Sequence, residues 1–104
     1  MTVFRPSAYA VPVSPASVQA DHPGFSFDIF RDPPDQVWAD FTHDTDEFVV
    51  VAEGRIVIEI GAECADCQPG DLVRIPAGMR HTLRTAPECG SVWYYGYGRF
   101  GEES

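Results

Sequence analysis

The chain has 104 residues, of which 44% are hydrophobic and 12% aromatic, so it has enough apolar material for one folded domain and is unlike a disordered segment. Sixteen acidic residues against seven basic ones give a formal net charge of −9, which disfavours nucleic acid and anionic membrane surfaces as partners. No apolar run approaches the roughly 20 residues of a membrane helix, and prolines interrupt the N-terminal region that could form a secretory leader. We therefore expect a cytoplasmic protein.

Residues 1–23 are rich in Pro, Ser and Ala, which predicts an extended N-terminal arm with an edge strand, because proline is excluded from the centre of a sheet. In a small barrel such an arm often packs on a partner subunit, so we expect a homodimer. His22 lies in this arm between Asp21 and Pro23, where we expect a solvated side chain.

Short apolar stretches separated by turn residues follow the arm, and none of them keeps an apolar period of 3.6 residues. The pattern predicts eight strands, at residues 24–30, 36–43, 47–52, 55–60, 63–67, 72–75, 79–85 and 91–97. Glu53 and Gly54 fit a tight hairpin turn, because glycine tolerates a positive φ. These strands predict an all-β sandwich or barrel over residues 24–98, followed by a frayed tail at residues 99–104.

Three cysteines, Cys64, Cys67 and Cys89, are too few for a disulfide framework. Cys64 and Cys67 form a CxxC pair, but they lie in a predicted strand, where residues three apart face opposite sides of the sheet. We expect Cys67 in the core, alternating with Ala65, and Cys64 on the surface. This structural role is favoured over redox or zinc chemistry.

Two of the three histidines, His43 and His81, lie at strand ends, and Glu47 follows His43 by four positions. In a small barrel these three side chains can converge at one mouth. They make up the ligand set of a facial 2-His-1-carboxylate site, which suits a divalent transition metal such as Fe, Mn, Ni or Zn. Glu47 is then a metal ligand or, if displaced, a catalytic general base. In the alternative, the barrel is metal-free and the two histidines line a pocket, hydrogen-bonded to Glu47 or to a ligand.

Two stretches with fixed internal spacing resemble the two sequence motifs of the cupin superfamily. Cupins are small β-barrel proteins that usually hold a metal ion. His43, Glu47 and Gly54 match the second histidine, the glutamate and the glycine of the first motif. The second motif is matched by Gly70, Pro76, Gly78 and His81. The resemblance covers about residues 36–98. It implies a double-stranded β-helix, or jelly-roll, barrel with an N-terminal arm, and a metal site at the matched histidines and glutamate.

Two positions depart from the family pattern. Phe41 stands where the first histidine of the first motif would be, which removes one of four expected ligands and places an aromatic wall beside the site. The remaining three ligands can still hold a metal, although more weakly. Thr85 stands where an asparagine often closes the second motif, at a position that is not expected to be a ligand. Asp44 and Asp46 are expected in a solvated acidic loop rather than as partners of the metal ligands.

The last predicted strand is unusually aromatic, and alternation places three of its rings on one face: Trp93, Tyr95 and Tyr97. If this face points into the barrel, it can stack on a small ligand together with Phe41. Packing in a core or a dimer interface is the commoner use of such rings. Arg74 either points into the barrel and pairs with an acidic substrate, or lies on the surface.

These features favour two functions. The first is a metal-dependent enzyme, because the cupin family that the chain resembles includes dioxygenases, isomerases, lyases and decarboxylases that act on small molecules. The second is a binding or sensor module that holds a sugar-like or other metabolite without turnover. A purely structural dimeric domain ranks last, because it leaves two histidines and a glutamate at metal-ligand positions unexplained.

Overall fold

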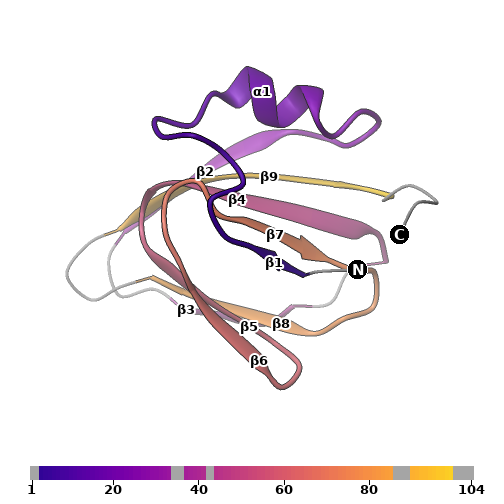
Figure 1. Ribbon diagram of the computed structural model, residues 1–104. Coiled ribbons are helices and arrows are strands. Elements are labelled where there is room, and N and C mark those ends of the chain that lie inside the picture. The colour runs from indigo at the N-terminus through magenta and orange to yellow at the C-terminus, as the bar shows by residue number, and fades with distance from the viewer. Residues whose placement is uncertain (1–2, 34–36, 42–43, 86–89, 100–104) are drawn as a thin grey trace.

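The computed structural model describes residues 3–33, 37–41, 44–85 and 90–99, and within them the strands form two antiparallel sheets that face each other (Figure 1). The first sheet has the order β1 (Phe4–Arg5), β7 (Leu72–Ile75), β4 (Asp46–Gly54), β9 (Ser91–Gly98) and β2 (Asp28–Asp32). The second has the order β3 (Val37–Phe41), β8 (His81–Thr85), β5 (Ile56–Ile60) and β6 (Glu63–Cys67). The predicted all-β jelly-roll barrel is confirmed. No described helix is long and apolar enough to cross a membrane.

The connection between β4 and β5 passes from one sheet to the other, so the tight hairpin predicted at Glu53–Gly54 is wrong. β4 pairs with β7 and β9, whereas β5 pairs with β6 and β8. Gly54 has a φ of 77°, and a Cβ atom there would collide with the carbonyl oxygen of Gly90. Gly54 is therefore needed both for its backbone conformation and for the close approach of the chain that enters β9.

Replacing Gly54 by alanine should lower the free energy of unfolding by about 3 kcal/mol or more, because the left-handed strain is added to a collision with backbone. Gly61 offers a matched control, since its φ is also positive (58°) but the space around it is open. Gly61→Ala should cost only about 1–2 kcal/mol. Urea denaturation of both variants measures the difference, and equal losses would show that the close approach to Gly90 does not matter.

The barrel interior is filled by side chains that alternate along the strands with outward-facing ones. The buried members of this inner core are Val49, Val51, Ile56, Ile58, Ile60, Cys67, Val73, Ile75, Leu83 and Trp93. Phe30 and Tyr95 pack against them. The alternation predicted for the last strand is thus confirmed, with Trp93 facing inward and Tyr94 facing outward.

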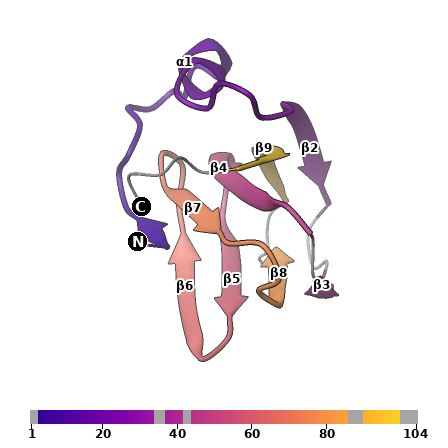
Figure 2. The same ribbon diagram turned by 90° about the vertical axis from the view of Figure 1, so that its right-hand side faces the viewer.

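A second apolar layer lies on the outer face of the first sheet, where the N-terminal arm covers it (Figure 2). The arm contains the predicted edge strand β1, and also a helix, α1 (Pro15–Ala20), which the sequence analysis did not predict. Ser14 caps this helix by accepting a hydrogen bond from the Ser17 amide, and Val18 is fully buried against the sheet. The arm packs on its own chain, so its sequence gives no argument for a homodimer, which stays a prediction.

His22 follows α1 and is buried, so the prediction of a solvated side chain is wrong. Its ring stacks on Phe48 with centroids 4.0 Å apart, and its Nδ1 donates to the carbonyl of Val18 at 2.8 Å. Burial lowers the pKa of His22, and the positive charge of Arg74 acts in the same direction, against the raising effects of the Val18 carbonyl and Asp21. The neutral imidazole therefore serves as an aromatic anchor for the arm.

This lowered pKa predicts an acid-dependent loss of stability. Above the ordinary histidine pKa of about 6.5 the neutral ring is present in both states. As the pH falls below that value, the unfolded chain takes up a proton that folded His22 resists, so the free energy of unfolding decreases. His22→Phe keeps the stack without the titration and should flatten the difference between pH 7 and pH 5. A variant with the same pH profile as the parent would contradict this assignment.

The first predicted strand, at residues 24–30, begins later than expected, because β2 pairs with β9 only from Asp28 to Asp32. Phe25 and Phe27 instead belong to the layer beneath the arm. Asp32, which lies between two of the predicted strands, is the last residue of β2, is buried, and accepts a 2.8 Å hydrogen bond from Nε1 of Trp93. This bond satisfies the indole inside the barrel and holds β2 in register with β9.

Candidate functional site

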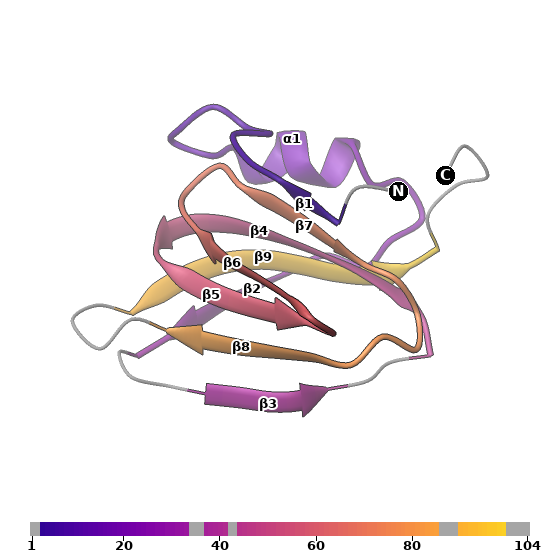
Figure 3. The same cartoon turned by 60° about the horizontal axis from the view of Figure 1, so that its bottom comes forward.

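Glu47 and His81 meet inside one end of the barrel, where β4 and β8 both begin (Figure 3). Glu47 lies on the first sheet, opposite Ile75 and Tyr97, and His81 lies on the second, opposite Ile60. Their side chains are almost fully buried, and Oε1 of Glu47 is 3.4 Å from Nε2 of His81. Two of the three predicted ligands therefore converge across the two sheets, although 34 positions separate them in the sequence.

The hydrogen bond at Nδ1 of His81 determines the protonation state of Nε2, the ring nitrogen that faces Glu47. Nδ1 of His81 is 3.1 Å from the carbonyl oxygen of Met79, and a carbonyl can only accept, so Nδ1 carries a proton. In the neutral imidazole Nε2 then has only a lone pair, which faces a carboxylate. Such a contact is stable only if a proton lies between the two atoms, as in an imidazolium–carboxylate pair, or if a metal cation does.

The electrostatics of the metal-free state favour the proton. Burial acts to lower the pKa of His81, but the hydrogen bonds to Glu47 and Met79 and the charge of Glu47 outweigh it. The pKa of His81 is therefore raised above its ordinary value. A buried carboxylate and imidazole thus form a pair that can exchange one proton for one metal ion.

A hydrogen bond to Asp46 fixes the loop that precedes His81. Oδ1 of Asp46 accepts from the backbone amide of Ala77 at 2.8 Å. Gly78 turns the chain with a φ of 79°, and Met79 then supplies the carbonyl that orients the imidazole. Asp46 was expected to be a solvated loop residue, and its positioning role gave no signal in the sequence.

A row of aromatic rings lines the wall beside the pair. Phe30 and Trp93 have centroids 5.3 Å apart, Trp93 and Tyr95 5.2 Å, and Tyr95 and Tyr97 5.9 Å. Burial and the charge of Glu47 raise the pKa of Tyr97 to about 12, so its phenol stays neutral at physiological pH. Trp93, Tyr95 and Tyr97 therefore share one face of β9, as predicted, and Trp93 is packed in the core while Tyr97 reaches the site.

The described part of the structure does not place the side chains of the other predicted site residues, His43, Phe41 and Arg74, at the contact between Glu47 and His81. His43, the third predicted ligand, lies outside the described residues. Phe41 occupies the β3 position opposite His81, and only its place in the strand is described. Arg74 does not point into the barrel as one alternative had it, because it shares the outer face with its cross-strand partner Phe48 and lies near His22.

Among the described residues, no group of three His, Cys, Asp or Glu side chains could hold a metal ion. Glu47 and His81 supply two ligands, so a protein-bound ion there needs the third one predicted at His43. The donor types fit a first-row divalent ion, since an imidazole Nε2 and a carboxylate oxygen already face each other.

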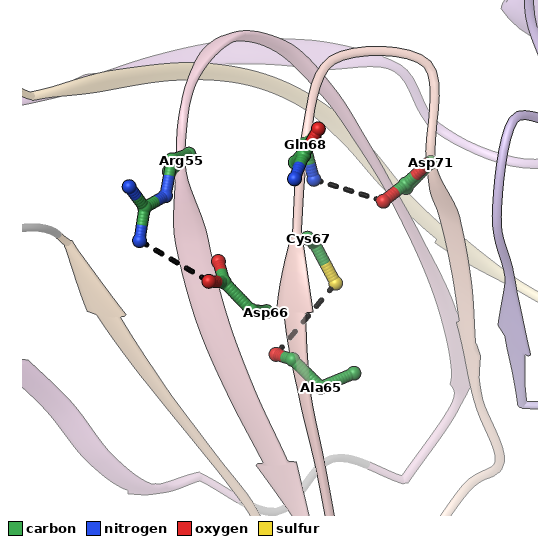
Figure 4. A network of polar contacts seen from close by, with 6 residues as sticks. All are labelled: Arg55, Ala65, Asp66, Cys67, Gln68 and Asp71. Atoms are coloured by element: carbon green, nitrogen blue, oxygen red, sulfur yellow. Dashed lines mark hydrogen bonds and ion pairs between the residues drawn. The ribbon is translucent and has the colours of Figure 1, made fainter.

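The CxxC pair takes no part in this site. Cys67 is buried and Cys64 exposed, as predicted. Figure 4 shows Asp66 and Cys67 pointing to opposite sides of β6, with Asp66 paired to Arg55 at 3.1 Å. Burial, with the charges of nearby carboxylates, raises the pKa of the Cys67 thiol to about 12, which makes it unreactive. A cavity of about 320 Å³ beside this strand is lined partly by β1 and includes neither Glu47 nor His81.

The family model described as "Cupin domain" matches residues 29–89, which is more than half of the chain. The chain belongs to the cupin family. The match spans both motifs, so the resemblance predicted from Glu47, Gly54 and His81 is confirmed. No curated protein matches this cupin.

Solved structures share the fold of this cupin. TT1209 from Thermus thermophilus is 24% identical, with a TM-score of 0.65 over 92% of this chain and 89% of that one. A Silicibacter pomeroyi protein described as a sugar phosphate isomerase is 25% identical, with a TM-score of 0.65 over 74% of this chain and 52% of that one. A salicylate 1,2-dioxygenase from Pseudoaminobacter salicylatoxidans is 14% identical, with a TM-score of 0.67 over 73% of this chain and 20% of that one. The TT1209 and dioxygenase likenesses show the jelly-roll fold alone.

In metal-free protein, Glu47→Gln should lower the pKa of His81, because the substitution removes the charge that stabilises the imidazolium. A histidine titration followed by NMR measures the change. Glu59→Gln is the matched control, since Glu59 pairs with Arg84 on the surface and should leave His81 unchanged. An unchanged His81 pKa in Glu47→Gln would show that the pair does not interact electrostatically.

Proposed function

We propose that this cupin binds a divalent transition metal through Glu47, His81 and His43, and binds a small molecule beside it. The observation that supports the metal is the facing of Nε2 of His81 and Oε1 of Glu47, with Nδ1 already used by the Met79 carbonyl. This tautomer presents the Nε2 lone pair to any cation held by the carboxylate.

The spacing of the two ligand atoms also fits an ion. Two ligands about 2.05 Å from a tetrahedral centre lie roughly 3.3 Å apart. The 3.4 Å between the Glu47 and His81 atoms is close to that value and is long for a direct hydrogen bond between them. Both side chains come from strands of a packed barrel, so metal binding needs little rearrangement of the backbone.

A bound ion would supply a Lewis acid for an oxygen atom of the ligand. The chain's own residues would bind and orient that ligand: Tyr95 and Tyr97 offer neutral phenols and ring faces, and Glu47 offers the carboxylate that could accept a proton. The named neighbours include both a sugar phosphate isomerase and a dioxygenase, so the proposal concerns the site and leaves isomerase, dioxygenase and lyase chemistry open.

A metal-free binding module is the second candidate. Phe41 stands on β3 opposite His81, at the position where the family pattern has its first histidine. In that case the His81 imidazolium and the Glu47 carboxylate would neutralise each other, and the aromatic wall would hold the ligand without a metal ion. The homodimer and the cytoplasmic location expected from the sequence also stay proposals.

Metal content of tag-free protein, measured by plasma mass spectrometry after incubation with Fe, Mn, Ni and Zn, tests the metal site. We expect near-stoichiometric metal in the parent protein and at least a tenfold loss of occupancy in His81→Ala, which lacks one ligand. His22→Phe removes a histidine on the outer face of the first sheet, keeps the stack on Phe48 and should keep the metal. Absence of metal from the parent would contradict the proposal and leave the binding module.

A further inference from the structure

We propose that the ligand of this barrel is a neutral, hydroxyl-bearing small molecule, and that the metal-free barrel rejects phosphorylated and other anionic molecules. This inference rests on the proposed binding of a small molecule at the Glu47 end of the barrel. It names the chemical class of that molecule from the distribution of charge in the chain.

No arginine or lysine lies inside the barrel. The chain contains no lysine, and its seven arginines all fall within the described residues: Arg5, Arg31, Arg55, Arg74, Arg80, Arg84 and Arg99. Arg55 and Arg84 form surface ion pairs with Asp66 and Glu59. Arg74 faces the arm near His22.

The four remaining arginines are exposed to solvent. Arg5 lies opposite Leu72, which belongs to the outer layer, and Arg31 alternates with the inward-facing Phe30. Arg80 and Arg99 are nearer the site, but they precede β8 and follow β9 rather than lining the interior. No arginine is therefore buried inside the barrel, where it could meet an anion.

Both charged groups that act on the phenol of Tyr95 are carboxylates. Glu47 is buried beside His81, which offsets its charge in the metal-free pair, and the exposed Asp28 lies opposite Tyr95 at the same end of β9. A phosphate or carboxylate on the ligand would lie beside Asp28 and Glu47, so like-charge contacts oppose its binding.

The usual devices for binding phosphate are absent from the described part of this wall. Proteins hold phosphate with arginine forks, lysines or the N-terminus of a helix. Here the one described helix, α1, lies on the far side of the first sheet, over its outer face. His81, the imidazole at the site, is already paired with Glu47.

What the wall does offer suits a neutral ligand with hydroxyl groups and an apolar face. Tyr95 and Tyr97 are half-buried, so their phenols and ring faces are accessible, and Tyr97 lies directly opposite Glu47. The phenols can donate hydrogen bonds, the Glu47 carboxylate can accept them, and the ring row beyond offers a stacking surface. Sugars and neutral phenols share these properties.

A metal ion held by Glu47 and His81 would add no positive group along Trp93, Tyr95 and Tyr97. Its own charge would attract an anionic oxygen of a ligand, however, so the selectivity that the wall sets is expected in chelated protein.

The test measures affinities for matched neutral and anionic probes by isothermal titration calorimetry, with chelated protein. One arm compares mannose and glucose with their 6-phosphates, and the other compares catechol with 3,4-dihydroxybenzoate. We expect at least one neutral probe to bind, and its anionic counterpart to bind at least tenfold more weakly. Equal or tighter binding of the anionic member overturns the inference, as does the absence of binding by every neutral probe.

A pair of tyrosine variants locates the binding. Tyr95→Phe removes a phenol from the wall and should weaken the neutral probe about three- to tenfold, the effect of losing one hydrogen bond. Tyr9→Phe removes a phenol from the arm, where it bonds to Asp21, and should not change the affinity. Equal effects would place the ligand elsewhere. Metal content is measured separately, so a barrel without metal that still discriminates by charge contradicts the metal proposal only.

Discussion

The contact between Glu47 and His81 is the constraint on which the candidate site of this barrel depends. It joins β4 of one sheet to β8 of the other, and both side chains are buried where an unpaired charge would be costly. The surroundings hold the two groups in place: Met79 fixes the tautomer, and Asp46 ties down the loop that precedes β8. A proton or a metal ion must complete the pair, so the fold and the chemistry are coupled at this point.

The charged side chains differ between the inside and the outside of the barrel. Carboxylates occur within or beside the barrel at Glu47, Asp32 and Asp28, whereas the arginines lie on outer faces or beyond strand ends. The carboxylate of Asp32 accepts a hydrogen bond from the indole of Trp93. Glu47 and His81 are therefore the reactive polar groups of the described interior. A barrel with this interior is suited to cations and neutral donors.

Local patterns predicted much of the fold. Alternation identified most strands, because one face of each is buried against the inner core, and the spacing around Glu47, Gly54 and His81 indicated the cupin barrel. The tight turn at Gly54 was wrong for a physical reason: the positive φ serves equally for a hairpin or for a crossing between sheets, and only the tertiary pairing distinguishes them.

Features that depend on distant partners could not be predicted. α1 is too short to show a helical period, and its stability comes from burying Val18 on the sheet. His22 has the sequence context of a polar surface residue, and only its tertiary stacking partner, Phe48, shows that it is buried. The side of the sheet that Arg74 faces follows from its pairing with β4, which no local pattern around it revealed.

Crystals grown with Mn²⁺ and measured near the manganese absorption edge would test whether Glu47 and His81 hold a metal ion. We expect an anomalous peak between Nε2 of His81 and Oε1 of Glu47, within about 2.3 Å of both atoms. The absence of a peak, with the imidazole and the carboxylate in direct contact in the presence of millimolar Mn²⁺, would contradict it.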